Sequence, residues 1–336
     1  MAVPDVAVRG WAGLRPRFDA LEKDPAPDLE AWLASYSALS ASLAEAESRR
    51  YVATTRRTDD PKAAKSHLDF QTKVLPRCKP RWQALKRKLL SHPGLRKLPR
   101  DYAVFLKHTR NEAALFRKAN VALEAREAAL VQAYQKRCGA QTVTFDGREQ
   151  PLPMLGKVLE ETDRARRQAA WEAVARRRLR DRGAIDALFT HLLALRARVA
   201  RNAGFRNFRD YAFRRMGRFD YTPADCMRFH KAVEKTLVPA LRARQARRAA
   251  QLGVGTLRPW DLAVDPQGRP PLKPYATTAA LVAGCRRIFG RVHPDFGRKF
   301  DRIRAKGYLD LDSRKGKAPG GYMCGFDAER MPFIFV

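Results

Sequence analysis

The chain has 336 residues, 45% of them hydrophobic and 30% charged, which is enough for one large or two smaller globular domains. This composition excludes an intrinsically disordered protein. No apolar run approaches the roughly 18 residues that a membrane-spanning helix needs. Sixty-seven basic residues against 35 acidic ones give a formal net charge of +32. Such a charge indicates either a binder of nucleic acid or another anionic surface, or a solvated helical surface rich in arginine.

The distribution of the charge favours the solvated surface. Basic residues occur along the whole chain with acidic ones between them, and the densest run is Arg176, Arg177, Arg178, Arg180 and Arg182. No recognition helix, zinc finger or aromatic RNA-binding motif accompanies that run. We therefore expect nucleic acid to bind only non-specifically.

The N-terminus and the cysteines indicate the compartment. Segment 1–17 contains Asp5, Arg9 and Arg15 and no apolar core, so it does not resemble a secretory signal. The five cysteines are widely spaced and form no CxxC pair: Cys78, Cys138, Cys226, Cys285 and Cys324. This spacing fits reduced thiols better than disulfides or a zinc knuckle, so we expect a cytoplasmic protein.

The first half of the chain has helical periodicity. Asp28 is a good N-cap, and apolar residues then recur at helical spacing at Leu29, Trp32, Leu33, Tyr36, Leu39 and Leu43. Asp60-Pro61 predicts a second helix start, with a kink or end near Pro76 and Pro80. A long helical stretch is expected over 101–137.

The period changes at 142–145, where Thr-Val-Thr-Phe alternates and Asp146-Gly147 follows as a strong turn signal. The sequence therefore predicts a small β-hairpin near 142–150. Helices are expected to resume near Pro153, with a break around Gly183.

Segment 204–226 is dense in aromatic residues and arginines. It fits either a stacking platform for single-stranded nucleic acid or a packed junction between helices. Thr222-Pro223 with Asp225 then predicts a helix start. The Trp260-Asp261 pair follows that helix, and two further helices are expected at 277–289 and 294–305.

The C-terminal 30 residues combine two strand signals with a glycine-rich loop. Strands are expected near 308–312 and 331–336, with a polar loop over 313–321. The loop is no phosphate-binding P-loop, because Ala318 follows Gly316-Lys317 and Leu311 occupies the position of the first glycine. It can be an ordinary connection or a place where the backbone comes close to a ligand.

The segment GYLDLDSRKGKAPGGY, followed by PFIF, resembles the oligoendopeptidase F branch of the thimet oligopeptidase-like zinc metallopeptidases. The resemblance extends upstream over most of the chain. In that family the segment lies directly before the helix that carries the zinc motif HExxH, and the present sequence ends before that motif would begin. The resemblance therefore implies the N-terminal portion of such an enzyme.

The resemblance also implies a fold and a substrate. The family fold is mainly α-helical, a two-lobed ellipsoid with a channel for short, unfolded peptides, which leads us to expect a helical domain over 1–150 and a second helical region over 151–336. Substrate contacts would come from Gly320, Gly321 and Tyr322, beside an edge strand that pairs with peptide backbone. Trp260 and Asp261 match a family element in the wall near the substrate cleft.

The chain itself offers no catalytic or metal-binding residue that we can identify. Its six histidines are His67, His92, His108, His191, His230 and His293, and none begins an HExxH pattern. We expect zinc only in the complete enzyme, which would hydrolyse internal bonds of short peptides, and a complementing C-terminal half as a partner. The alternative is a non-catalytic basic helical protein that binds peptides or nucleic acid.

Overall fold

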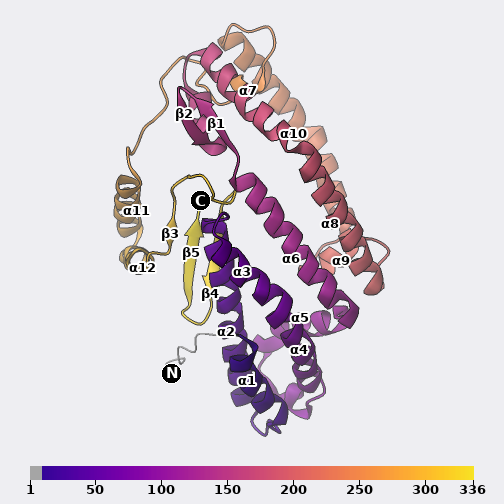
Figure 1. Cartoon of the computed structure of the whole chain (residues 1–336). Helices are drawn as coiled ribbons and strands as arrows, with labels where there is room; N and C mark the ends of the chain where they lie inside the picture. Colours follow the sequence, from indigo (N-terminus) through magenta and orange to yellow (C-terminus); the bar gives the residue numbers. More distant parts are fainter. Residues whose placement is uncertain (1–9) are drawn as a thin grey trace. The chain divides into compact units, whose positions relative to one another are not determined.

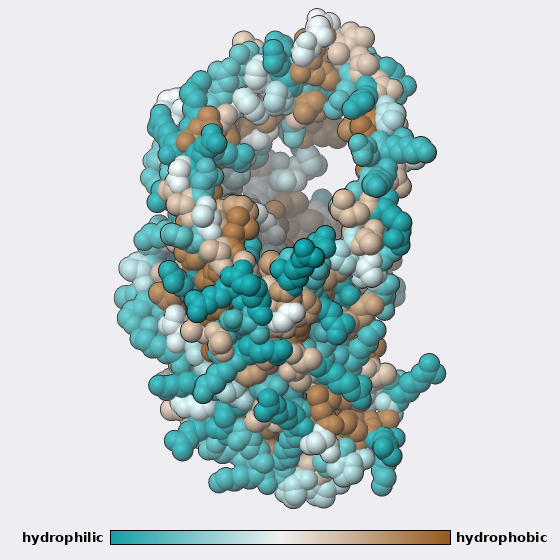
Figure 2. Space-filling model, turned by 90° about the vertical axis from the view of Figure 1, so that its right-hand side faces the viewer, coloured by the Kyte–Doolittle hydropathy of each residue, from teal (hydrophilic) through white to brown (hydrophobic). Residues whose placement is uncertain are grey.

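The structure is a computed structural model that describes residues 10–336, so the first part of segment 1–17 lies outside the described residues. Twelve α-helices and five short strands make up the regular structure of this range, which confirms the mainly α-helical fold (Figure 1). Across residues 10–336, every helix is too short or too polar to span a bilayer. Hydrophilic residues cover most of the face in Figure 2, as expected for a solvated surface.

Contacts between residues divide the chain into two compact units. Unit 1 contains the residues up to Tyr134 together with Ala187–Asp225 and Cys324–Met331, and unit 2 contains Gln135–Asp186, Cys226–Met323 and Pro332–Val336. The sequence-based boundary near residue 150 stays a prediction.

The core of unit 1 lies among its first helices, namely α1 (Trp11–Lys23), α2 (Leu29–Arg56), α3 (Pro61–Asp69), α4 (Leu75–Leu90) and α5 (Ala103–Leu115). Phe18, Trp32 and Leu85 are among the largest side chains that are almost wholly buried there. The Trp32 indole N–H donates to the Leu21 carbonyl at 3.0 Å, so this aromatic side chain is buried with its polar atom satisfied.

The predicted helix starts in this unit are confirmed. Asp28 accepts hydrogen bonds from the backbone N–H groups of Glu30 and Ala31, and Asp60 does the same for Lys62 and Ala63. An end or kink was predicted near Pro76 and Pro80. A π-helical turn over Phe70–Val74 separates α3 from α4 just before Pro76, whereas α4 continues through Pro80.

The long helix expected over 101–137 is in fact two helices, α5 and α6 (Lys118–Gly139). Phe116 has an extended backbone and ends α5. The buried Asn120 amide donates to the Val199 carbonyl at 3.0 Å and accepts from Asn202 at 2.7 Å. These contacts with α8 (Arg182–Asn202) hold the start of α6, and helical periodicity does not encode them.

The aromatic segment 204–226 forms a packed junction in unit 1. Tyr211 of α9 (Phe208–Arg215) is buried in a cluster with Val199 and Ala203, and Phe205 and Phe208 pack against that cluster. The rings of Phe205 and Tyr211 meet edge to face with centroids 5.7 Å apart. These rings therefore serve the core and are not a free stacking platform.

Unit 2 contains the predicted hairpin, in which β1 (Thr142–Phe145) pairs antiparallel with β2 (Arg148–Pro151). Asp146 and Gly147 both have positive φ, as a two-residue hairpin turn requires. The longer helices of the unit are α7 (Arg164–Arg180), α10 (Pro223–Gln251), α11 (Thr278–Val292) and α12 (Pro294–Ala305). The break near Gly183, the start of α10 at Pro223 and the pair α11–α12 are as predicted.

The C-terminal strands form one sheet in the order β3-β5-β4. The strands β3 (Leu309–Asp310) and β5 (Met331–Phe335) were predicted and pair in parallel, with Leu309 opposite Ile334. The strand β4 (Tyr322–Phe326) was not predicted, and it lies at the edge of the sheet beside β5.

We expect Leu85→Ala in α4 to lower the free energy of unfolding by about 3 kcal/mol, because the Leu85 side chain is fully buried and its removal leaves a cavity. Urea unfolding followed by circular dichroism measures the change. Val104→Ala is the matched control, since 67% of Val104 is exposed, and a similar loss in both variants would contradict the placement of the core.

Candidate functional site

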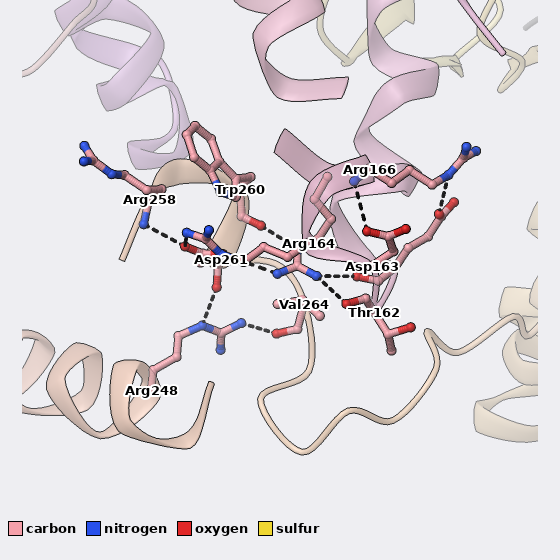
Figure 3. Close-up of polar contacts among 11 residues, drawn as sticks. Thr162, Asp163, Arg164, Arg166, Arg248, Arg258, Trp260, Asp261 and Val264 are labelled. Carbon is pink, nitrogen blue, oxygen red and sulfur yellow. Dashed lines mark hydrogen bonds and ion pairs between the residues drawn. The ribbon is translucent and has the colours of Figure 1, made fainter. Parts of the chain in front are cut away.

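The Trp260-Asp261 pair lies in a short 3₁₀ turn, Pro259–Asp261, that is built around a buried carboxylate. Arg164, at the start of α7, forms two bonds with the Asp261 carboxylate, at 3.0 and 2.9 Å. The Arg258 backbone N–H donates to it at 2.9 Å, and Arg167 donates at 3.3 Å. Four donors from the protein thus occupy the carboxylate oxygens of Asp261 (Figure 3).

Two further arginine contacts fix the backbone of the same turn. Arg167 is almost fully buried, and its guanidinium donates to the carbonyl oxygens of Trp260 and Thr162, both at 2.8 Å. Arg248 of α10 donates to the Asp261 carbonyl at 2.8 Å and to the Val264 carbonyl. Figure 3 shows Arg164 and Arg248 pointing toward Asp261 from two helices. Side chains from distant parts of the sequence therefore set the position of this turn.

The carboxyl group of Asp261 stays ionised. Burial by itself raises the pKa of this carboxyl, but the bonds from Arg164, the Arg258 backbone and Arg167 outweigh burial, so its pKa lies below the ordinary value. A carboxylate with these partners has no acid–base role near neutral pH. Its contribution is to hold the turn in place.

Trp260 is half-buried, and its ring centroid lies 5.5 Å from that of Trp171 in α7. Its indole nitrogen is buried with no hydrogen-bond partner among the described residues. Because Asp261 is enclosed by protein groups, Trp260 is the member of the pair that a ligand can reach. Substrate contact by either residue stays a prediction.

The glycine-rich segment is organised by Lys317, which is buried in unit 2. Its ammonium group lies 2.8 Å from an Asp310 carboxylate oxygen and 3.0, 2.9 and 2.6 Å from the carbonyl oxygens of Asp310, Asp312 and Val336. It also lies 4.4 Å from the centre of the Phe335 ring. Lys317 therefore ties the loop to the ends of both β3 and β5.

Arg314 is a second cation that binds the Asp310 carboxylate. It forms a bidentate pair with the Asp310 carboxylate at 2.7 and 2.8 Å. Burial would raise the pKa of Asp310, but Arg314 and Lys317 together hold it well below its usual range. The pKa of Lys317 is lowered by burial, although Asp310 opposes that effect. The buried lysine and the carboxylate are a matched pair.

The predicted substrate residues follow this anchored loop. Gly320 has a φ of +89°, which a residue with a side chain adopts only with strain. A Cβ on Gly321 would lie 3.2 Å from the Phe335 carbonyl oxygen, so this glycine allows close approach to β5. The Tyr322 ring stacks on that of Phe335 with centroids 4.6 Å apart. The two glycines thus serve the packing of the sheet, and a role in substrate binding stays a prediction.

The turn after β4 is fixed within unit 1. Arg49 of α2 pairs with Glu329 at 2.8 Å and lies 4.2 Å from the centre of the Phe326 ring. The Glu45 carboxylate accepts the Glu329 backbone N–H at 3.0 Å. Contacts at this turn thus hold the end of β4 within unit 1.

The histidines give no metal site. His92 and His293 cap helices through Nδ1, His108 packs on Phe219 and His67 is buried in the core. No three His, Cys, Asp or Glu side chains in residues 10–336 gather closely enough to hold a metal ion. The described residues do not fit a catalytic zinc, so we assign no step through zinc to them.

We expect Asp261→Asn to lower the free energy of unfolding at pH 7 by about 3 kcal/mol, because Arg167 would stay buried without its ionised partner. The folded-state pKa of Asp261 is depressed, so its stabilisation is full above the unfolded pKa of about 4 and is lost as the pH falls further. The gap between the variant and the unchanged chain should therefore narrow in acid.

Urea titrations at pH 7, 4 and 3 measure this gap. Asp265→Asn is the control, because Asp265 makes a more exposed pair with Arg269, and its effect should be much smaller. Equal effects of the two substitutions would contradict the buried role of Asp261.

Comparisons with known proteins agree with the resemblance. The model of peptidase family M3 matches residues 158–336. None of the curated proteins matches the chain. Three solved structures superpose on it with a TM-score of 0.89. An oligoendopeptidase F is 25% identical over 99% of this chain and 59% of its own, and PZ peptidase A, solved with inhibitor 2, is 25% identical over 96% and 58%.

The third structure, an oligoendopeptidase F from Bacillus anthracis, is 21% identical over 96% of this chain and 60% of its own, and at that identity it supports the fold alone. The chain spans less than two thirds of the length of these solved structures. The family model covers more than half of the chain, including the Trp260-Asp261 turn and the C-terminal sheet. The chain therefore belongs to peptidase family M3.

Proposed function

We propose that this chain is the substrate-handling portion of a zinc-dependent oligopeptidase that cleaves internal bonds of short peptides. Membership of family M3 and the similarity to solved oligoendopeptidase F and PZ peptidase A structures support the class of substrate. The observation that carries the proposal is the edge strand β4, which has β5 as its only neighbouring strand in the described chain.

Peptide binding at such an edge follows from backbone chemistry. An edge strand offers N–H and C=O groups at regular spacing, and an extended peptide can add to it as a further strand. The side chain of Met323, the second residue of β4, is 66% exposed and is available for contact with a peptide side chain. Lys317 keeps the loop before β4 in place before any peptide binds, which lowers the entropic cost of binding.

Zinc in the complete enzyme would activate the water that attacks the peptide bond. The part that we assign to this chain is to bind and align the peptide, with Gly320, Gly321 and Tyr322 next to the edge strand and Trp260 in the wall. The role of Asp261 is to position Trp260.

We further propose a cytoplasmic location. All five cysteines are free, and burial raises the pKa of the Cys78 thiol to about 12, which keeps this thiol unreactive. Free thiols of this kind fit a reducing compartment.

We expect a short peptide labelled with a fluorophore to bind this chain, and methylation of alternate backbone nitrogens to weaken binding about tenfold for one alternate set only. The reason is that only every second N–H of a strand points toward its neighbour. Fluorescence polarisation measures the affinity. Equal effects of the two sets would contradict pairing with a strand.

Variants of the chain provide the control for this experiment. Lys317→Met should weaken peptide binding, because it releases the loop from the ends of β3 and β5. Lys315→Met removes a lysine two positions away whose pair with Glu149 is exposed, and it should leave binding unchanged. The alternative basic binding protein would instead lose affinity for anionic ligands in Lys315→Met, because Lys315 is exposed and Lys317 is buried.

A further prediction concerns zinc. We expect the purified 336-residue chain neither to retain zinc on dialysis nor to cleave peptides. Co-expression with the remaining portion of an oligoendopeptidase F relative should give peptide hydrolysis that a chelator abolishes and zinc restores. Chelator-sensitive cleavage by the highly purified chain alone would contradict the proposal.

A further inference from the structure

A cavity of about 550 Å³ lies in unit 2, between the last turns of α10 and the loop that follows the turn Pro259–Asp261. Arg244, Arg248 and Gln251 line it from α10, and their spacing i, i+4, i+7 places them on one face of that helix. Most of the other lining residues come from the loop, over 262–272. A cavity of this volume has room for a small organic molecule.

Arg248 is held in the wall of this cavity by uncharged partners. Its guanidinium group donates to the Asp261 carbonyl oxygen at 2.8 Å and to the Val264 carbonyl oxygen (Figure 3). Backbone carbonyl groups carry no net charge, and no acidic side chain in residues 10–336 forms an ion pair with Arg248. The positive charge of Arg248 is therefore fixed in position and is not paired.

Arg244 lies one helical turn before Arg248 and adds a second unpaired charge. It is exposed and forms neither an ion pair nor a hydrogen bond with the described residues. Like charges at the spacing i, i+4 destabilise a helix. The sequence has no Asp or Glu between Lys235 and Trp260, so no acidic side chain on this part of α10 offsets the repulsion. An anion bound in the cavity would offset it.

Two acidic residues in the lining of the cavity limit the charge of that anion. Asp265 pairs with Arg269 at 2.7 Å and accepts the Gln267 backbone N–H at 2.8 Å, and Glu160 is the second acidic residue. Three lining arginines against two carboxylates leave a net charge of +1. One carboxylate group on a ligand matches that charge, whereas Glu160 and Asp265 would repel the second charge of a phosphate dianion.

We propose that this cavity binds a small organic monocarboxylate, whose carboxylate group pairs with Arg248 and Arg244. The two carbonyl oxygens already orient the guanidinium group of Arg248, so little conformational freedom is lost when the carboxylate binds. Gln251 can donate its side-chain amide to the same carboxylate. No residue of β4 lines the cavity, so the inference goes beyond the proposed function.

Titration calorimetry of the whole chain with phenylpropionate tests the chemistry of the ligand. This probe has one carboxylate and no peptide group, so it cannot pair with β4 as a strand. We expect phenylpropionamide, its uncharged analogue, to bind at least about tenfold more weakly, and inorganic phosphate to bind more weakly than the carboxylate. Equal binding of the carboxylate and the amide, tighter binding of phosphate, or no binding of the carboxylate would overturn the proposal.

Variants of the chain test the location of the site. Arg244→Met should weaken binding of phenylpropionate about tenfold. Arg247→Met is the matched control, because Arg247 is an exposed arginine of the same helix that does not line the cavity, and it should leave binding unchanged. Glu160→Gln should strengthen binding about threefold, because it removes a like charge. Equal losses in the two arginine variants, or a loss in Glu160→Gln, would overturn the proposal.

Discussion

The contact between Lys317 and Asp310 is the interaction on which the C-terminal sheet depends. One buried ammonium group binds a carboxylate and the carbonyl oxygens at the ends of two strands, and Arg314 binds the same carboxylate. A buried lysine without these acceptors would be strongly destabilising. The glycines that follow are therefore set in one place, and β4 begins from a fixed point.

A second buried carboxylate organises the Trp260 turn on the same principle. The chain carries almost twice as many basic as acidic residues. Several arginines can therefore bind one acidic side chain. Arg164, Arg167 and Arg248 reach Asp261 or its backbone from α7 and α10. Part of the high positive charge is thus structural. Arg287 and Arg291 of α11 have no such structural role, since they are exposed and form no ion pair with the described residues.

The sequence predicted features whose causes are local. The caps at Asp28 and Asp60 and the turn at Asp146-Gly147 depend on neighbouring backbone groups, and the structure has all three. Two features were missed because their causes are distant. The break at Phe116 comes before a helix, α6, whose start is held by contacts of Asn120 with α8. The strand β4 follows a glycine loop directly, so only its pairing with β5 reveals it as a strand.

For the candidate site, the sequence likewise identified candidate residues but not the distant side chains that hold them. Trp260, Asp261 and the segment Gly320 to Tyr322 were selected by resemblance, but the residues that hold them were not, because arginine and lysine partners have no fixed spacing from a carboxylate. Sequence reasoning could have noted that Asp310 and Lys317 flank a loop between strands. It could not show that the ammonium also reaches Val336.

Hydrogen exchange of the whole chain, with and without a saturating short peptide, tests the central claim most directly, namely that β4 is a peptide-binding edge. The account predicts slower exchange at alternate amides of Tyr322–Phe326 when the peptide is bound, with little change in the helices of unit 1. Unchanged exchange in β4, with protection instead along the arginine-rich helices, would contradict it.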